Sequence, residues 1–268
     1  MLELVVVEAS SHAQSSRAEV LGCPLDCVSM AETVQLVARA VEGGRPFVHT
    51  SLNAAKVLAA RRNDDLLRAI VRSDVITADG QGVVWAARAL GHPVPERVTG
   101  IDLMEQLLAR AAAEGWSVYV LGAREDALEQ AIAELRRLHP ALVVAGRQHG
   151  YFSPADERAV VESIVAARPQ LLFVALDTPA KELFLERNRE RLGPIFAMGV
   201  GGAVDVLAGR KRRAPRWVQQ TGLEWLYRFA QDPRRLARRY LLGTAAFLGL
   251  VGRELVERRV RAACGTFR

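Results

Sequence analysis

The sequence predicts an α/β protein in which a mostly parallel sheet carries helices on both faces. Between residues 17 and 209, short apolar runs alternate with amphipathic helical segments, the order typical of such a fold. Three of the runs, at 118–122, 171–176 and 195–200, are apolar without alternation, so we expect strands buried on both faces. Half of the 268 residues are hydrophobic and a quarter are charged, a composition that excludes disorder, collagen and coiled coil.

Each strand is predicted from a short apolar run and the helices from their amphipathic pattern, three of them with a polar cap at the start. The caps pair a hydroxyl residue with an acidic residue three positions later, as in Ser29 with Glu32, Thr99 with Asp102 and Ser153 with Asp156. The predicted strands cover residues 47–50, 75–77, 117–122, 141–146, 171–176 and 194–200. The predicted helices lie near 30–42, 53–72, 80–90, 101–114, 125–138, 154–167, 179–191 and 202–208.

The basic residues concentrate at the carboxyl-terminal end of the chain. The whole chain has a formal net charge of +6, but residues 210–268 hold 15 basic residues against four acidic ones, a local net charge of +11. Residues 1–209 therefore carry −5. Because the change begins at the basic loop GRKRRAPRW (209–217), we expect an α/β core at 1–209 and a basic helical appendage at 210–268, with helices at about 215–230 and 233–260.

The appendage allows three interpretations. Arginines interleaved with Trp217, Trp225 and Phe229 suit the surface of an anionic membrane better than a nucleic-acid groove. A helical subdomain packed on the core with a solvated arginine face is the second interpretation. The third is the phosphate-binding tail of a noncatalytic nucleotide- or nucleic-acid-binding protein. The apolar run 240–251 has 12 residues, whereas a membrane-spanning helix needs about 20.

The chain shows the features of a cytoplasmic protein. Its first 17 residues lack the basic start and long apolar stretch of a signal peptide. Cys23, Cys27 and Cys264 form neither a disulfide framework nor a paired zinc motif, which fits a reducing compartment. The five histidines have no HxH or HExxH spacing and the sequence contains no DxD, so we predict no metal site. Serine-hydrolase and P-loop motifs are also missing from the sequence.

Small and polar residues follow the predicted strands, at the edge where an open α/β sheet binds its ligands. Asp79 comes directly after a strand and before Gly80 and Gly82, where glycine lets a ligand approach the backbone closely. A carboxylate here suits a general base that takes a proton from an attacking hydroxyl. The alternative is that Asp79 caps the following helix.

Other strand ends suit a nucleotide. The glycines of Gly199-Val200-Gly201-Gly202 precede a helix and present backbone N–H groups to a diphosphate, or they form a tight turn. Asp205 suits a ribose hydroxyl or the positive end of the helix, and Tyr151 suits stacking on a base or packing. Arg97 has the planar guanidinium that pairs with phosphate oxygens, or it is a surface arginine.

Several sequence blocks occur in an order that resembles one family. They are TSLNAAKV (50–57), ADGQGVVWAARALG (78–91), PERVTGIDLM (95–104), VYVLGA (118–123), GYF (150–152) and GVGGAVDVLAGRKRRAPRWVQQTGLEWLYRFAQDPRRLARRYL (199–241). Together they resemble the WecG/TagA/CpsF family of bacterial glycosyltransferases, glycosyltransferase family 26, over roughly residues 20–245.

This resemblance implies a Rossmann-like core that transfers a sugar, with inversion and without a metal or cofactor, from a UDP-sugar to a polyprenyl-diphosphate-linked saccharide. Founding members of the family transfer N-acetylmannosamine to undecaprenyl-diphosphate-linked N-acetylglucosamine, and relatives act in capsule and exopolysaccharide synthesis. The implied partners are the donor, the lipid-linked acceptor and an anionic membrane surface at the cytoplasmic face, with no nucleic acid. Some family members self-associate, which also allows a homo-oligomer.

The resemblance also implies roles for individual residues. Asp79 matches the base that deprotonates the acceptor hydroxyl, and Arg97 matches an arginine that stabilises the diphosphate leaving group. The polar cluster beside the base corresponds to Thr50 or Ser51, with Asn53. Positions that contact the uridine or shape its pocket correspond to Tyr151, Asp205, Gly122, Gly201 and Gly202. Appendage arginines that contact lipid or donor phosphates correspond to Arg228, Arg235 and Arg238.

One stretch departs from the family pattern. After the strand at 171–176, family members show Gly-x-Pro-Lys-Gln-Glu, whereas this chain has Asp177-Thr178-Pro179-Ala180-Lys181-Glu182. Lys181 takes the place of an active-site glutamine, and its positive charge changes the hydrogen bonding offered to sugar or phosphate. The departure leaves open a UDP-glucose or UDP-glucuronate donor. In the alternative, Lys181 pairs with Asp177 or with the diphosphate, and the chemistry of the family is unchanged.

Overall fold

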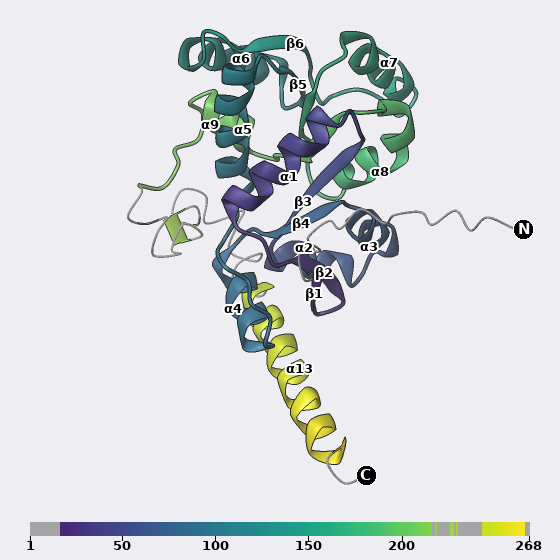
Figure 1. Cartoon of the computed structure of the whole chain (residues 1–268), viewed down its shortest axis with the longest axis vertical. Helices are drawn as coiled ribbons and strands as arrows, with labels where there is room; N and C mark the ends of the chain where they lie inside the picture. Colours follow the sequence, from purple (N-terminus) through teal and green to yellow (C-terminus); the bar gives the residue numbers. More distant parts are fainter. Residues whose placement is uncertain (1–16, 216–217, 219–225, 228, 230–242, 266–268) are drawn as a thin grey trace, which may run out of the picture.

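The computed structural model describes residues 17–215, 218, 226–227, 229 and 243–265. In this part of the chain, strands and helices alternate and form a six-stranded parallel sheet with helices on both faces (Figure 1). The predicted fold class is therefore confirmed.

The strands of the sheet run in the order β4-β3-β8-β7-β5-β6, and every neighbouring pair is parallel. Their bounds are β3 (Phe47–Leu52), β4 (Val75–Ala78), β5 (Ser117–Gly122), β6 (Val143–Gln148), β7 (Leu171–Ala175) and β8 (Phe196–Gly199). The central strands β5, β7 and β8 are almost wholly buried, as their unbroken apolar runs predict. Because all six strands are parallel, their carboxyl ends share one edge of the sheet.

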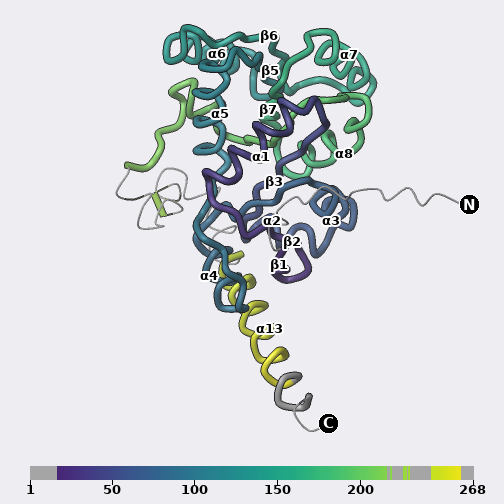
Figure 2. Tube along the Cα trace, in the orientation of Figure 1, coloured from purple at the N-terminus to yellow at the C-terminus, as the bar shows by residue number. Residues whose placement is uncertain are grey.

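Two helical layers cover the sheet (Figure 2). On one face, α1 (Met30–Glu42), α5 (Gly100–Glu114) and α6 (Glu125–Leu138) share an apolar core with the strands. On the other face, α7 (Glu157–Ala167) and α8 (Ala180–Leu192) pack over β5 and β7, and α3 (Asp64–Val71) packs against α8. Each layer buries the apolar stripe of its amphipathic helices.

A third core lies at the β4 edge and includes an antiparallel hairpin outside the predicted elements, β1 (Arg17–Val20) with β2 (Cys23–Asp26). The hairpin joins α2 (Ala54–Ala60) and α4 (Gln81–Ala89) in this core. The Asp26 carboxylate accepts from Arg17 Nε at 2.9 Å and from the backbone N–H of Ile76 at 2.8 Å. One buried carboxylate thus fixes the hairpin to the sheet.

Local capping explains which predicted helix boundaries agree with the structure and which differ from it. The predicted helix at 53–72 is two helices, because the Asn63 side chain accepts from the backbone N–H of Leu66 and starts α3. The Ser29 capping box of α1 is confirmed. Ser153 does not cap α7, which begins at residue 157; its hydroxyl donates instead to Asp156, at 2.6 Å, in the preceding turn.

Two further helices follow β8. The short α9 (Ala203–Leu207) lies beside α6, and α13 (Gly243–Gly265) extends away from the body of the protein at its carboxyl-terminal end (Figure 1). The first half of α13 is packed: Phe247, 1% exposed, and Val251 belong to the core that contains α2 and α4. This contact matches the interpretation of a helix packed on the core. Within the described residues, no helix has the length and apolar content needed to cross a membrane.

Candidate active site

Asp79 and Asn53 lie next to each other where β4 and β3 end. The backbone N–H of Asp79 donates to the carbonyl of Leu52 at 2.8 Å, and a Cβ added to Gly80 would lie 3.8 Å from Asn53 Cβ. Asn53 caps α2, accepting from the backbone N–H of Lys56 at 3.0 Å. The cap residue of α4 is Gly80, so Asp79 does not take the cap position that the alternative interpretation gave it. Asp79 is partly exposed at the carboxyl edge of the sheet.

The loop that contains Arg97 is hydrogen-bonded to the end of β4. The backbone N–H of Val98 donates at 2.9 Å to the carbonyl of Ala78, the residue before Asp79. Arg88 holds this loop by donating to the carbonyl of Val94 at 2.9 Å. The half-exposed Arg97 lines an open depression of about 450 Å³ together with Met30, Glu96, Asp102, Glu105, Gln106 and Ala109.

Ser51 and Thr50 point to opposite sides of β3, as neighbouring strand residues do. A Cβ added to Gly100 would lie 3.9 Å from both Ser51 Oγ and the carbonyl oxygen of Gly199, so the ends of β3 and β8 meet the start of α5 there. Thr50 Oγ1 instead lies 2.8 Å from Ser73 Oγ, just after α3. Of the two residues that the sequence left as alternatives, Ser51 is the one on the side of Gly100.

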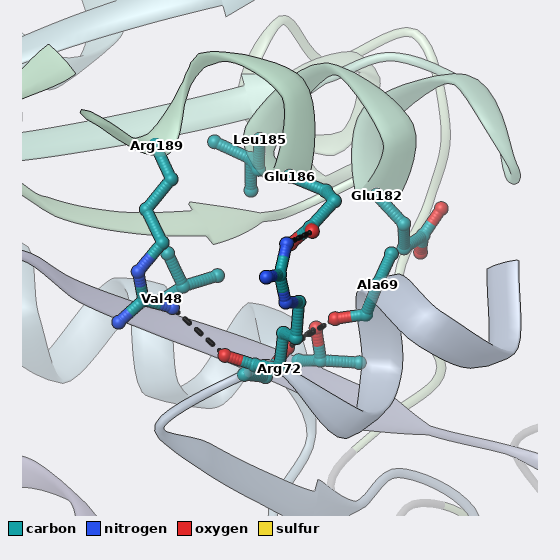
Figure 3. A pocket seen from close by; sticks show the side chains of 9 residues that line it. Val48, Ala69, Arg72, Glu182, Leu185, Glu186 and Arg189 are labelled. Atoms are coloured by element: carbon teal, nitrogen blue, oxygen red, sulfur yellow. Dashed lines mark hydrogen bonds and ion pairs between the residues drawn. The ribbon is translucent and has the colours of Figure 1, made fainter. Parts of the chain in front are cut away.

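A small pocket lies between α3 and α8 (Figure 3), and Thr50 is one of the residues that line it. Arg72 and Glu186 form an ion pair there, with Nη1 and Oε1 2.5 Å apart. The cavity measures about 10 Å³, room for a single water molecule and far too little for a sugar. The candidate active site is therefore the open carboxyl edge of the sheet.

Lys181 forms a buried ion-pair cluster with Lys56 and Glu182. Lys181 is 7% exposed, and Lys56 and Glu182 are each 5% exposed. Glu182 Oε1 lies 2.7 Å from Lys56 Nζ and 3.1 Å from Lys181 Nζ, and Lys181 also donates to the Thr178 hydroxyl. Burial and the neighbouring charge of Lys56 lower the pKa of Lys181. Although burial opposes ionisation of Glu182, the two lysines hold its pKa below the ordinary value.

Sequence reasoning singled out Lys181 but missed Lys56 and Glu182. A signal was available, because lysine is rare in this arginine-rich chain. Of its three lysines, two form this cluster and the third, Lys211, forms an ion pair with Asp205.

Glycines allow the ends of β5 and β7 to lie in close contact. Gly122 has φ +118°, and a Cβ there would lie 2.5 Å from the Ala175 carbonyl group. A Cβ on Gly150 would come within 3.0 Å of Gly122 Cα, so the loop after β6 also approaches here. The chain leaves β5 toward β6 and β7 toward β8, in opposite directions, which makes the β5/β7 boundary a topological switch point. Tyr151, 73% exposed, follows Gly150.

The loop after β8 carries the remaining predicted nucleotide contacts. Gly201 has φ +50°, a left-handed conformation that favours glycine. Asp205 on α9 pairs with Lys211, whose Nζ lies 3.8 Å from where a Cβ on Gly202 would be. Arg228, Arg235 and Arg238, the predicted lipid or phosphate contacts, lie outside the described residues.

The start of the basic appendage is tied to the core by ion pairs. Arg210 Nη2 lies 2.8 Å from Asp126 Oδ2, and Arg213 pairs with Asp102 and with Glu105. These acidic residues come from α6 and α5, which flank the carboxyl edge. Among the residues that the structure describes, no three His, Cys, Asp or Glu side chains gather closely enough to hold a metal ion.

Comparison with known proteins assigns the chain to a family. A substrate-binding periplasmic protein from Ralstonia solanacearum is 21% identical over 68% of this chain, with a TM-score of 0.30, too low to support an argument. The match spans about half of that protein, 52% of its length. The model of the glycosyl transferase WecG/TagA/CpsF family, by contrast, matches residues 18–261. The chain belongs to the WecG/TagA/CpsF family of glycosyl transferases.

Proposed function

We propose that this protein transfers a sugar from a UDP-sugar to a polyprenyl-diphosphate-linked saccharide, with inversion at the anomeric carbon. The observation that carries the proposal is the meeting of Asp79, Asn53 and the Arg97 loop at one edge of the sheet. The β5/β7 switch point, with Gly122 at the end of β5, lies on the same edge and suits the nucleotide. The family match supports glycosyl transfer as the reaction class.

In this proposal Asp79 accepts the proton of the acceptor hydroxyl as its oxygen attacks the anomeric carbon. The bond from that carbon to the diphosphate oxygen breaks on the opposite face, and UDP leaves with the electron pair. Arg97 stabilises the negative charge that develops on the diphosphate. Ser51 and Asn53 orient the sugar beside the base. General-base assistance of this kind contributes about 10²–10⁴-fold to a rate.

The nucleotide half of the site comprises Tyr151 for the base and Asp205 for the uridine hydroxyls. Gly122, Gly201 and Gly202 leave room for the backbone to approach the ligand. Asp205 is paired with Lys211, so the proposal requires that this exposed lysine move toward the diphosphate when the nucleotide binds.

N-acetylmannosamine is the first candidate for the transferred sugar, because founding members of the family use it. UDP-glucose and UDP-glucuronate remain alternatives because of Lys181. The acceptor places the enzyme at the cytoplasmic face of the membrane, with Arg228, Arg235 and Arg238 facing phosphates. We assign the α/β core, 1–209, to catalysis and the appendage, 210–268, to the membrane, and a homo-oligomer is compatible with both.

Exposed apolar side chains support the membrane assignment. Trp85 on α4 is exposed, and so are Leu248, Val256 and Val260 on α13. The two helices are in contact, because the Arg258 side chain on α13 donates to the carbonyl of Leu90, the C-cap residue of α4, at 3.1 Å. Arginines beside apolar residues suit an anionic lipid surface. Flotation with anionic vesicles that weakens at high salt and fails with neutral vesicles is the expected result, and equal flotation with both would contradict it.

Substitution of the base tests the catalytic proposal. With radiolabelled UDP-N-acetylmannosamine and a lipid-diphosphate acceptor, Asp79→Asn should lower kcat about 10²-fold or more while UDP binding is retained. Asp65→Asn, which changes an exposed carboxylate on α3, serves as the matched control and should keep full activity. If Asp79→Asn transferred sugar at the wild-type rate, Asp79 would not be the base.

A further inference from the structure

The buried cluster around Glu182 holds more positive than negative charge. Lys56 and Lys181 both pair with the single carboxylate of Glu182, which leaves a net charge of +1. Asp177, the other acidic group that acts on Lys181, is exposed to solvent. Burying a charge is unfavourable unless a partner of opposite sign accompanies it. Among the residues that the structure describes, the cluster therefore lacks one negative charge.

The second oxygen of Glu182 does not supply a further contact to either lysine. Both lysines lie against Oε1, and Oε2 is buried without a hydrogen-bond partner among the described residues. Glu182 also lines the cavity of about 10 Å³ between α3 and α8, which has room for one water molecule. One oxygen of the Glu182 carboxylate, Oε1, thus contacts both ammonium groups, and Oε2 contacts neither.

Lys181 lies at the ligand-binding edge of the sheet. Its aliphatic stem covers Gly199, the last residue of β8, so closely that a Cβ on Gly199 would lie 2.6 Å from Lys181 Cδ. Gly199 also opens the glycine-rich loop through Gly202. Lys181 is the second residue of α8, a helix of 13 residues whose N-cap makes no side-chain hydrogen bond. The helix dipole adds to the positive potential at this point.

We propose that Lys181 binds an anionic oxygen of the donor substrate and makes the enzyme selective for it, with Lys56 and Glu182 as positioning residues. The inference rests on the proposed use of a UDP-sugar. Two groups of such a donor have the required chemistry: the carboxylate of a hexuronosyl group, and the diphosphate. Either supplies the negative charge that the cluster is short of, and a charge-assisted hydrogen bond to the ammonium is a strong one.

Isothermal titration with UDP, UDP-glucose and UDP-glucuronate tests the inference on the wild-type protein and on Lys181→Gln. The variant keeps the Lys56–Glu182 pair, and Lys181→Met provides a second neutral replacement. Arg68→Gln, which removes an exposed cation from α3, controls for the overall charge of the protein. We expect Lys181→Gln and Lys181→Met to weaken binding about tenfold or more, and Arg68→Gln to leave it unchanged.

The pattern of losses identifies the anion. Weakening confined to UDP-glucuronate assigns Lys181 to the sugar carboxylate, and equal weakening of all three ligands assigns it to the diphosphate. Wild-type affinity in both Lys181 variants, or the same loss in Arg68→Gln, overturns the inference while the proposed use of UDP-sugars stands. If the wild-type protein bound none of the three ligands, both the proposed function and this inference would be wrong.

Discussion

Glu182 Oε1 lies 2.7 Å from Lys56 Nζ, and both side chains are about 95% buried. Lys56 comes from α2, after β3, and Glu182 from α8, after β7. The ion pair therefore ties together two crossovers that leave the carboxyl edge of the sheet on either side of β8. A buried ion pair of this kind fixes geometry more than it adds stability.

Removal of the Glu182 charge should destabilise the protein strongly. Glu182→Gln leaves two buried ammonium groups without a counter-charge, and we expect a loss of about 3–5 kcal/mol in the free energy of unfolding. Urea denaturation at pH 7 measures it. Addition of Lys56→Met to the same variant should recover part of the loss, because it removes one of the uncompensated charges. A loss below about 0.5 kcal/mol in the single variant would show that the cluster is not electrostatically coupled.

The carboxyl-terminal helix should contribute to the stability of the core. Phe247 and Leu248 are neighbours on α13, but Phe247 is 1% exposed and Leu248 is 59% exposed. Phe247→Ala should cost about 3–5 kcal/mol through the cavity it leaves beside α2, and Leu248→Ala should change stability by about 0.5 kcal/mol or less. Thermal unfolding of the two variants compares them directly. Equal midpoints would mean that α13 does not pack on the core in solution.

Gly122 should not tolerate a side chain. In Gly122→Ala the new Cβ would lie 2.5 Å from the Ala175 carbonyl, at a φ of +118° that alanine rarely adopts. We expect a loss of at least about 2 kcal/mol in the free energy of unfolding and weaker UDP binding, because the ends of β5 and β7 must separate. Gly252→Ala, in the interior of α13 with nothing within 4 Å, should instead be neutral or stabilising. Unchanged stability and UDP affinity in Gly122→Ala would contradict the predicted clash.

His49 should make the protein less stable in mild acid. Complete burial, with the charge of Lys56 adding to it, lowers the pKa of His49 to about 3. Below pH 6.5 the unfolded chain binds a proton that the folded chain does not, so stability falls as pH decreases from about 6.5 toward 3, by up to about 1.4 kcal/mol per pH unit. Above pH 6.5 both states hold the ring neutral and the effect disappears.

Urea midpoints at pH 5 and pH 7.5 check this prediction. His49→Gln should show a smaller difference between the two midpoints than the wild-type protein. His139→Gln, at the partly exposed end of α6, is the matched control and should keep the wild-type difference. If His49→Gln showed the same difference between the two urea midpoints as the wild-type protein, other groups would be responsible for the acid sensitivity.

Local sequence patterns were enough to predict the elements of the core. The unbroken apolar runs of β5, β7 and β8 predicted buried parallel strands, and the Ser29 capping box predicted the start of α1. The β1–β2 hairpin was missed because its strands, RAEV and CPLD, contain no unbroken apolar run, and it is held by the long-range contact of Asp26 with Ile76. The break at Asn63 was missed because a cap inside a continuous helical pattern carries little weight.

The sequence by itself determined the α/β class, the basic appendage and a set of polar strand ends that includes Asp79, because period, charge and motif order are properties of consecutive residues. Only the tertiary structure decided that Ser51 rather than Thr50 is on the side of Gly100, and that Lys56, Lys181 and Glu182 form one buried cluster. Lys56 and Glu182 are 126 positions apart in the chain. Strand order brings them together, and strand order depends on long-range packing that no local pattern encodes.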